Sequence, residues 1–371
     1  MIQLGVIGCG DVAFRTYFPS IEELAGRAKV VAVFDVAPER ANRAAERFGA
    51  TAYTTLSDYL AHPGLEGTFN LTPAPFHRET TSAALDAGLH VLSEKPIAGT
   101  VEDAQALIAH AKARGKHLLV APAVMASNRF RWLTDVLGNG RIGRLTVATG
   151  QYSTMGPAGW RQYTGDPGVF YSEHVGPVLD LGVYPLHGIT GLMGPAKRVQ
   201  AFGGIVIPER KVQIRRLAGS ENIKVGANDV MMISLDFGGS YAQIFAGYST
   251  PGSRVPLMEI HGTEGTMSLS VPRFYDAKGP VEFFFRDDSL LGVDGWMNDV
   301  RNPEQEGATE LIGAGADHFV NVIEGKEEPI LTAEHATHIL EIMLKAKQSA
   351  DEGRAFDLET TFVPPAPKPA G

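Results

Sequence analysis

The first thirteen residues place two glycines and an alanine directly after a short apolar run. Residues 4–7 are Leu-Gly-Val-Ile, and the pattern Gly8-x-Gly10-x-x-Ala13 follows them. The first glycine permits a tight turn, the second lets the backbone approach a ligand, and a small third residue allows close helix packing. The pattern therefore predicts a strand, a glycine turn and a helix whose N-terminal N–H groups face bound phosphates.

Short apolar segments alternate with helical patterns over the rest of the first third of the chain. One predicted helix begins at Pro38 and ends at Gly49, and another is capped by Thr100 and ends at Gly115. The predicted strands between such helices are apolar on both faces, which is typical of a parallel sheet covered by helices. Residues 1–122 are therefore expected to form a doubly wound Rossmann domain.

The pattern changes after residue 122. Residues 145–153 alternate between apolar and polar, and the strand-like segments 231–237 and 241–248 are joined by Gly238-Gly239. Neighbouring strands joined by short turns are antiparallel. Residues 123–363 are expected to form an α+β domain on an open, mainly antiparallel sheet that carries substrate and mediates oligomerisation. The Pro/Ala/Lys-rich residues 364–371 are expected to be a disordered tail.

Composition excludes several classes of protein. The chain has 371 residues, one cysteine and a net charge of −9, and it has no apolar run of about 20 residues. These features predict a soluble cytoplasmic protein without disulfides, and they argue against membrane or nucleic acid as a partner. His335 and His338 are spaced i, i+3, but no third metal ligand is evident, so we expect no metal.

Asp35 ends the second predicted strand, where a carboxylate can accept the ribose hydroxyls of a dinucleotide. Its charge would repel the 2′-phosphate of NADP, and Val36 offers no compensating charge. NAD is therefore the expected cofactor, although Arg40 could still reach such a phosphate, which leaves NADP open. The expected loop contacts are Gly8, Cys9, Gly10, Asp11, Val12 and Ala13, with Cys9 as a small buried filler rather than a reactive thiol.

Further motifs resemble a known family. They are Asn70-Leu71-Thr72-Pro73, His77, Glu94-Lys95-Pro96 and Asp180-Leu181-Gly182-Val183-Tyr184. In this order they resemble the glucose-fructose oxidoreductase / inositol dehydrogenase / rhizopine-catabolism (Gfo/Idh/MocA) family. The resemblance implies that Thr72, Pro73, His77 and Glu94 lie at the cofactor and that Lys95 reaches the nicotinamide and the reacting hydroxyl. It also implies a homodimer or homotetramer.

The second-domain motif departs from the commoner family pattern. Many members carry histidine where this chain has Tyr184, and the tyrosine is similar to the branch in which it is the proposed acid/base. A phenol has a pKa of about 10, so it needs Lys95 nearby to accept a proton at neutral pH. Asp180, Tyr184 and His187 have i, i+4, i+7 spacing, which predicts one helix face. A core tyrosine at the domain junction is the structural alternative.

Several other residues are candidate substrate contacts. His187 replaces a carboxylate or amide that contacts substrate hydroxyls in some relatives, and His174 precedes Val175-Gly176-Pro177. Trp160 and Arg161 lie in a Gly/Pro-rich loop where an aromatic ring can stack on a sugar. Asp180 is expected to orient the lysine or a sugar hydroxyl. Buried histidines in the core and a helix cap at Asp180 are the alternatives.

The expected function is an NAD(H)-dependent oxidoreductase that transfers hydride between nicotinamide and a carbinol or keto carbon of a sugar, polyol or glycoside. One alternative is an NAD-dependent glycosidase that works by transient sugar oxidation and elimination. A second is a regulator that binds dinucleotide without catalysis. The sugar, the carbon and the physiological direction are left open.

Overall fold

The structure is a computed structural model that describes residues 1–161, 163, 165–213, 222–270, 279–285, 295–298 and 310–368. The chain divides into two compact units. Unit 1 contains Met1–Ser127 and Ala308–Leu340, and unit 2 contains Asn128–Gly307 and Glu341–Gly371.

Unit 1 contains a six-stranded sheet in the order β3-β2-β1-β4-β5-β6, in which all neighbouring pairs are parallel. Its strands are β1 (Ile2–Ile7), β2 (Ala28–Phe34), β3 (Thr51–Tyr53), β4 (Gly67–Asn70), β5 (His90–Ser93) and β6 (Leu118–Val120). Successive side chains of β4 and β6 are all buried, as expected for a sheet covered on both faces. The predicted Rossmann fold is confirmed.

Helices connect these strands. α2 (Pro38–Phe48) begins at its proline and ends at Gly49, whose φ is 63°. α5 (Val101–Arg114) begins after Thr100, whose hydroxyl accepts a hydrogen bond from the N–H of Asp103. The remaining helical segments before residue 127 are a π-helical turn (Ala13–Tyr17), α1 (Phe18–Glu22), α3 (Leu56–Leu60), a 3-10 turn (Ala74–Phe76) and α4 (His77–Asp86).

Residues 308–340 belong to unit 1, so the chain returns to this unit after it has formed most of unit 2. This differs from the expectation that a single boundary at residue 122 divides the two domains. In α8 (Glu310–Ile323), Phe319 packs edge-on against Phe69 of β4, with ring centroids 5.4 Å apart. Arg27 donates hydrogen bonds to Asn321 at 2.5 Å and Glu324 at 2.8 Å. The helix covers apolar surface of the Rossmann sheet. The second boundary falls within α9 (Ala333–Glu352), between Leu340 and Glu341.

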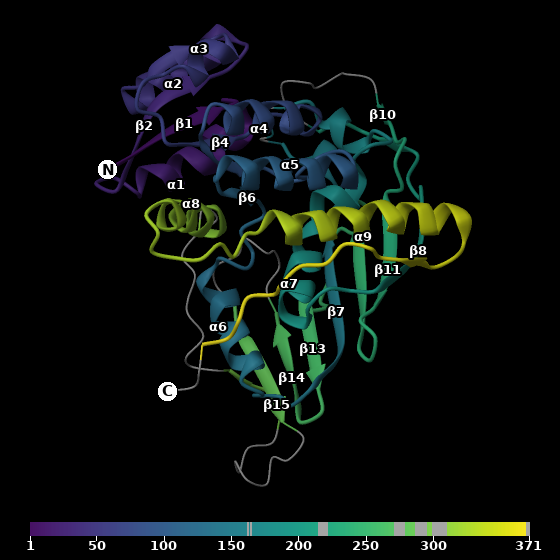
Figure 1. The fold of residues 1–371 in the computed structure, drawn as a ribbon. Coiled ribbons are helices and arrows are strands. Elements are labelled where there is room, and N and C mark those ends of the chain that lie inside the picture. Colours follow the sequence, from purple (N-terminus) through teal and green to yellow (C-terminus); the bar gives the residue numbers. More distant parts are fainter. Residues whose placement is uncertain are drawn as a thin grey trace. The chain divides into compact units, whose positions relative to one another are not determined.

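Unit 2 is built on a nine-stranded sheet in the order β16-β15-β14-β13-β7-β12-β11-β8-β17 (Figure 1). β7 and β12 are parallel, and the other described pairs are antiparallel, so the predicted mainly antiparallel sheet is confirmed. Its strands are β7 (Leu145–Ser153), β8 (Arg198–Gly204), β11 (Val230–Asp236), β12 (Tyr241–Gly247), β13 (Met258–Gly262), β14 (Gly265–Leu269), β15 (Val281–Phe285), β16 (Met297–Asn298) and β17 (Phe356–Asp357). A separate pair contains β9 (Glu209–Arg210) and β10 (Ile223–Lys224).

One face of the large sheet packs against α7 (Val183–Met193). At Gly150 of β7 a side chain would meet Ile189 at 2.9 Å and Pro185 at 3.0 Å, so the glycine lets the helix approach closely. The remaining helical segments of unit 2 are α6 (Asn128–Gly138), two 3-10 turns (Pro157–Gly159 and Pro167–Tyr171) and a π-helical turn (Val178–Gly182).

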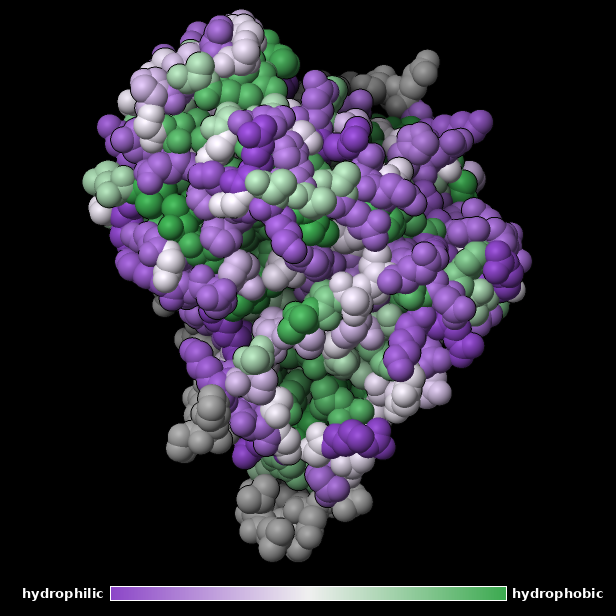
Figure 2. All heavy atoms as spheres, in the orientation of Figure 1, coloured by the Kyte–Doolittle hydropathy of each residue, from purple (hydrophilic) through white to green (hydrophobic). Residues whose placement is uncertain are grey.

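The opposite face of the large sheet exposes apolar side chains in adjacent positions. Phe202 and Met232 pair across β8 and β11 and are 74% and 50% exposed. Tyr241 pairs with Val147 across β12 and β7, and both are exposed. Elsewhere, the face of the molecule in Figure 2 is mostly hydrophilic, with hydrophobic residues largely in its recesses.

The described part of the C-terminal tail is ordered, which corrects the expectation of a disordered end. The backbone N–H of Lys368 donates to Asp135 at 2.8 Å, and the side chain of Asn139 donates to the Lys368 carbonyl at 2.8 Å. Pro367 lies against Gly138 at the end of α6. These contacts hold the tail against α6, and residues 369–371 lie outside the described part. No described helix is long and apolar enough to span a membrane.

Candidate active site

The glycine turn after β1 has the shape of a phosphate-binding loop. Gly8 has φ of 93°, and a side chain there would lie 2.8 Å from the backbone of Leu71. At Gly10, by contrast, a side chain would meet no atom within 4 Å. Gly8 allows the loop to pack closely on the Leu71 backbone, and the open space beside Gly10 allows a pyrophosphate to approach the backbone. Ala13 is buried below the loop, whereas Asp11 is partly exposed and Val12 exposed.

Asp35 ties the end of β2 to this loop. Its carboxylate is 6% exposed and accepts hydrogen bonds from the N–H of Cys9 at 2.8 Å and of Ala37 at 2.9 Å. Each carboxylate oxygen has more than one acceptor site, so both can also accept ribose hydroxyls. Val36 and Arg40 are exposed beside it. The residues around the loop therefore fit a dinucleotide.

Cys9 is a buried thiol within the loop. Burial is the main cause that raises its pKa to about 12, and the charge of Asp35 adds to the effect. The thiol form is unreactive, because the thiolate is the nucleophile. Its side chain is 1% exposed and packs in the Rossmann core, as a filler does.

The Thr-Pro loop and the Glu-Lys-Pro turn are joined through His77. One ring nitrogen of His77 lies 2.8 Å from the Thr72 carbonyl and the other 2.6 Å from the Pro96 carbonyl. The imidazole is 1% exposed, so it holds the two loops to each other. Thr72 donates its hydroxyl to Asn70 at 2.8 Å, and Pro73 is exposed at the tip of its loop.

Lys95 follows the C-terminal end of β5, where ligands bind in doubly wound sheets. The carboxylate of Glu94 accepts hydrogen bonds from the Lys95 N–H at 3.0 Å and from the Tyr17 hydroxyl at 2.7 Å. Glu94 thus fixes the backbone from which the lysine side chain leaves. Lys95 itself is half-buried.

In unit 2, Asp180 lies in the π-helical turn Val178–Gly182, and Tyr184 and His187 lie in α7. Pro185, in the first turn of α7, has no N–H to donate, so it removes no hydrogen bond that the start of this helix needs. All three side chains are buried, with Tyr184 6% exposed. The ring of Tyr184 packs edge-on against Tyr152 of β7, with centroids 5.6 Å apart.

Tyr248 is a partner of Asp180 that the sequence analysis missed. Its hydroxyl donates to the Asp180 carboxylate at 2.7 Å. Burial first, and then the charge of Asp180, raise the pKa of Tyr248 well above its usual value, so the phenol stays a donor. The two residues are 68 positions apart, and no motif or spacing links them.

A buried ion pair holds Tyr248 in place. Arg210 donates to Asp229 at 2.5 Å and to the Tyr248 carbonyl at 2.6 Å. Asp229 in turn accepts from the N–H of Val206 at 2.7 Å, and its carbonyl accepts from the Tyr248 N–H at 2.8 Å. The guanidinium also lies 5.6 Å from the ring of Tyr171. These contacts fix the backbone on both sides of the Tyr248 side chain.

The other predicted substrate contacts, Trp160, Arg161 and His174, differ in how exposed they are. Trp160 is partly exposed and lines a pocket of about 650 Å³ in unit 2, whereas Arg161 and His174 are exposed in loops. Tyr152 also lines this pocket. Within the described residues, no three or more His, Cys, Asp or Glu side chains gather as metal ligands do.

Two family models match successive parts of the chain. Residues 2–121 match the "Oxidoreductase family, NAD-binding Rossmann fold", and residues 130–268 match the "GFO/IDH/MocA C-terminal domain".

Individual relatives cover nearly the whole chain. The 1,5-anhydro-D-fructose reductase of Ensifer adhaerens is 27% identical over 97% of this chain and 99% of its own length. The D-xylose 1-dehydrogenase (NADP(+)) 2 of Haloferax volcanii is 22% identical over 96% and 100%. The crystal structure of an NAD-binding oxidoreductase from Klebsiella pneumoniae superposes with a TM-score of 0.81 at 20% identity, over 97% of this chain and 99% of that one. This chain belongs to the Gfo/Idh/MocA family of NAD-binding, sugar-related oxidoreductases.

Proposed function

We propose that the protein transfers hydride between NAD(H) and a carbinol or keto carbon of a sugar or sugar-like polyol. The observation that carries the proposal is the buried Tyr184 phenol, which lies one turn from an Asp180 carboxylate held by Tyr248. A phenol in such a setting can give a proton to a carbonyl oxygen or take one from a hydroxyl. The reductase of Ensifer adhaerens, whose name specifies a sugar ketone, supports the substrate class.

The nicotinamide, when bound, would give or accept the hydride. In this mechanism Tyr184 moves the hydroxyl proton, and the Lys95 ammonium stabilises negative charge on the same oxygen. Asp180 and His187 would hold neighbouring sugar hydroxyls. Asp180 is suited to this role because the Tyr248 hydroxyl donates to its carboxylate at 2.7 Å and so orients it, and a carboxylate offers several acceptor positions for hydroxyl groups.

NAD is the proposed cofactor over NADP. The support is Asp35, whose buried carboxylate occupies the position that binds ribose hydroxyls and would lie beside a 2′-phosphate. Arg40 could favour NADP instead, because its positive charge lies near the loop. That charge lowers the pKa of Cys9, although burial and the charge of Asp35 raise it by more. One relative named above is specified for NADP(+), so the choice needs a direct test.

We further propose a homodimer or homotetramer that covers the exposed apolar face of the large sheet. Two exposed cross-strand pairs on this face, Phe202–Met232 and Tyr241–Val147, leave large apolar side chains open to solvent, and exposed apolar patches often mark interaction sites. Phe202→Glu together with Met232→Glu should dissociate the assembly in sedimentation velocity, because opposed copies would bury like charges. A wild-type protein that sediments as a monomer at micromolar concentration contradicts this assignment.

Asp35→Ser should weaken NADH binding by roughly 10- to 150-fold, since a hydrogen bond to a charged group contributes about 1.5–3 kcal/mol. Discrimination against NADPH should relax, because the repelling charge is gone. Fluorescence titration with both cofactors measures the two constants. Glu39→Gln, which removes an exposed carboxylate nearby, is the control. Unchanged NADH binding in Asp35→Ser, or tighter NADPH binding by wild type, would show that Asp35 does not select the cofactor.

Tyr184→Phe should lower turnover by about 10²- to 10⁴-fold, the usual contribution of general acid/base catalysis. NADH affinity and thermal stability should change little, because the ring and its packing on Tyr152 remain. The measurement is NADH absorbance with a panel of sugars and polyols. Lys95→Ala should also lower turnover, and the double variant should be no worse than additive if both act in one step.

His187→Ala and His174→Ala in the same assay test the competing proton carriers, because an imidazole is the commonest general acid or base in enzymes. Near-normal turnover in Tyr184→Phe, with loss in one of these variants, would assign the proton to that histidine.

Tyr248→Phe should lower kcat by about 10- to 100-fold, because Asp180 loses a charge-assisted donor. Tyr59→Phe is the matched control: it removes another buried tyrosine hydroxyl, one bonded to Thr68. Unchanged kcat in Tyr248→Phe, or equal losses in both variants, would show that the Tyr248 hydroxyl does not position Asp180 for the reaction.

A further inference from the structure

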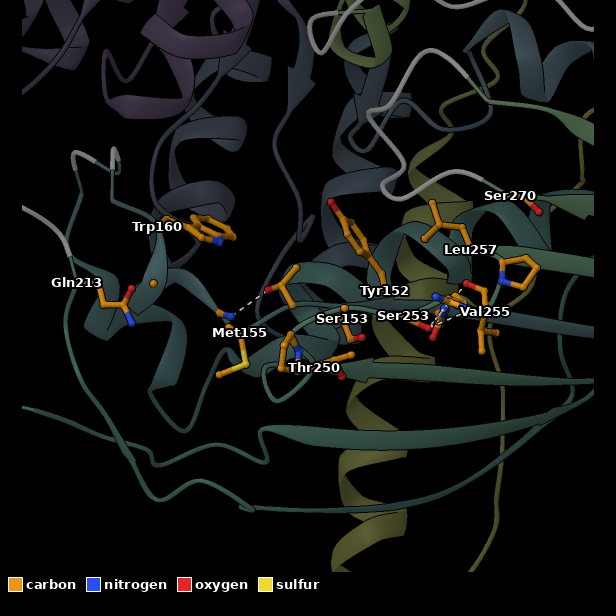
Figure 3. Close-up of a pocket in the computed structure, with 18 residues that line it drawn as sticks. Tyr152, Ser153, Met155, Trp160, Gln213, Thr250, Ser253, Val255, Leu257 and Ser270 are labelled. Carbon is orange, nitrogen blue, oxygen red and sulfur yellow. Dashed lines mark hydrogen bonds between the residues drawn. The ribbon is translucent and has the colours of Figure 1, made fainter.

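The pocket beside Trp160 lies wholly within unit 2 and has a volume of about 650 Å³. It is lined by residues of the segments 151–160 and 250–257, together with Gln213 and Ser270. In Figure 3, Trp160 and Gln213 lie on one side and Val255 and Ser270 on the other, with Tyr152 between them. This volume falls within the range of about 300–1,000 Å³ that encloses drug-sized ligands.

Hydrogen bonds fix one wall of this pocket. The Gln151 side chain donates to the Val255 carbonyl at 2.5 Å and to the Ser253 hydroxyl at 2.9 Å. The Gln151 N–H also donates to the Leu257 carbonyl at 2.9 Å. Segment 250–257 is therefore tied to the end of β7 along its length, and the dashed lines in Figure 3 mark the side-chain bonds.

The other wall is fixed as firmly. Thr154 accepts hydrogen bonds at its hydroxyl from the Gly156 N–H, at 2.9 Å, and at its carbonyl from the Thr250 N–H, at 3.2 Å. Arg210 reaches the Met155 carbonyl at 3.4 Å. The Trp160 ring is supported by Tyr163, with centroids 6.0 Å apart. A pocket with walls fixed before binding costs a ligand less in ordering.

The lining has the chemistry of a carbohydrate site. Trp160 and Tyr152 offer aromatic rings, and Gln151, Gln213, Ser253 and Thr250 offer neutral hydrogen-bonding groups. Among the described lining residues the one ionisable acid or base other than tyrosine is Arg254, which is exposed. Flat apolar faces and neutral polar groups match a sugar ring, whereas a diphosphate would call for several cationic or N–H donors.

Tyr152 connects this pocket to the proposed chemistry. It lines the pocket, and its ring lies 5.6 Å from the Tyr184 ring, centroid to centroid. The pocket therefore begins one aromatic ring away from the proposed proton carrier, and this relation holds within a single unit. A substrate that reacts at Tyr184 and extends past Tyr152 would enter the pocket.

We infer that this pocket binds the second, unreacting ring of a neutral glycoside, so that the substrate is a disaccharide or a similar glycoside rather than a free monosaccharide. The inference rests on the proposed function, because it takes Tyr184 as the place of reaction. Trp160 would stack on the second ring, and the amides and hydroxyls would bind its hydroxyl groups.

Calorimetric titration of the NADH-loaded protein tests this without requiring turnover. The probes are cellobiose, maltose, lactose and sucrose, each paired with the methyl glycoside of one constituent sugar. At least one disaccharide should bind about ten-fold more tightly than its matched methyl glycoside. Trp160→Ala should abolish that difference and leave the methyl glycoside constant unchanged. Trp160→Phe, which keeps a flat ring, should retain most of the difference.

Trp296→Ala is the control, because it removes an exposed tryptophan that does not line the pocket. Equal affinities within every pair, absence of binding, or a Trp160→Ala effect on both members of a pair overturns the inference. Tighter binding of UDP-glucose that is lost in Arg254→Gln overturns it in favour of an anionic substrate. If pocket-dependent binding is found but none of these sugars exchanges hydride with NAD or NADP, the proposed function fails and the binding site stands.

Discussion

The buried carboxylate of Asp35 is the constraint on which the cofactor half of this protein depends. A charged group that is 6% exposed must be satisfied by donors, and here the N–H groups of Cys9 and Ala37 supply them. The first donor fixes the glycine loop after β1, and the second fixes the approach to α2. The same carboxylate would meet the ribose. One side chain therefore holds the shape of the loop, and under the proposed function it would also select the cofactor.

Unit 2 uses a buried charge in a similar way. The pair Arg210–Asp229 is almost completely buried, and such pairs add little net stability by themselves because desolvation offsets the attraction. What the pair contributes is the position of the groups around it. The guanidinium fixes the Tyr248 carbonyl and reaches the Met155 carbonyl, so one cation positions both the phenol that serves Asp180 and a wall of the Trp160 pocket.

Local patterns were sufficient to predict the fold, because each depends on neighbours in sequence. Gly49 and Gly115 end helices in the left-handed conformation that glycine favours, and β7 has the predicted bounds, 145–153. The return of α8 was not predictable in this way. Its partner Phe69 is 250 positions away, and nothing in the local pattern of 310–323 specifies which apolar face it will cover. The tail escaped prediction similarly, since Pro367 and Lys368 are ordered by contacts with α6 rather than by their own composition.

In the candidate site, too, the features that depend on neighbouring residues were predictable and those that depend on distant residues were not. Residues in compact motifs, such as Gly8 to Ala13 and Glu94-Lys95-Pro96, were identifiable as candidates because the chemistry expected of them depends on backbone geometry over a few residues. Tyr248 was not, because its role exists only through Asp180, which the fold brings to it. Under the proposed function, unit 2 would bind the sugar through side chains of α7, of the preceding π-helical turn and of the pocket loops, whereas unit 1 would bind the cofactor largely through backbone N–H groups. If the Trp160 pocket binds substrate as proposed, substitutions on its loops would alter substrate choice without disturbing the cofactor loop.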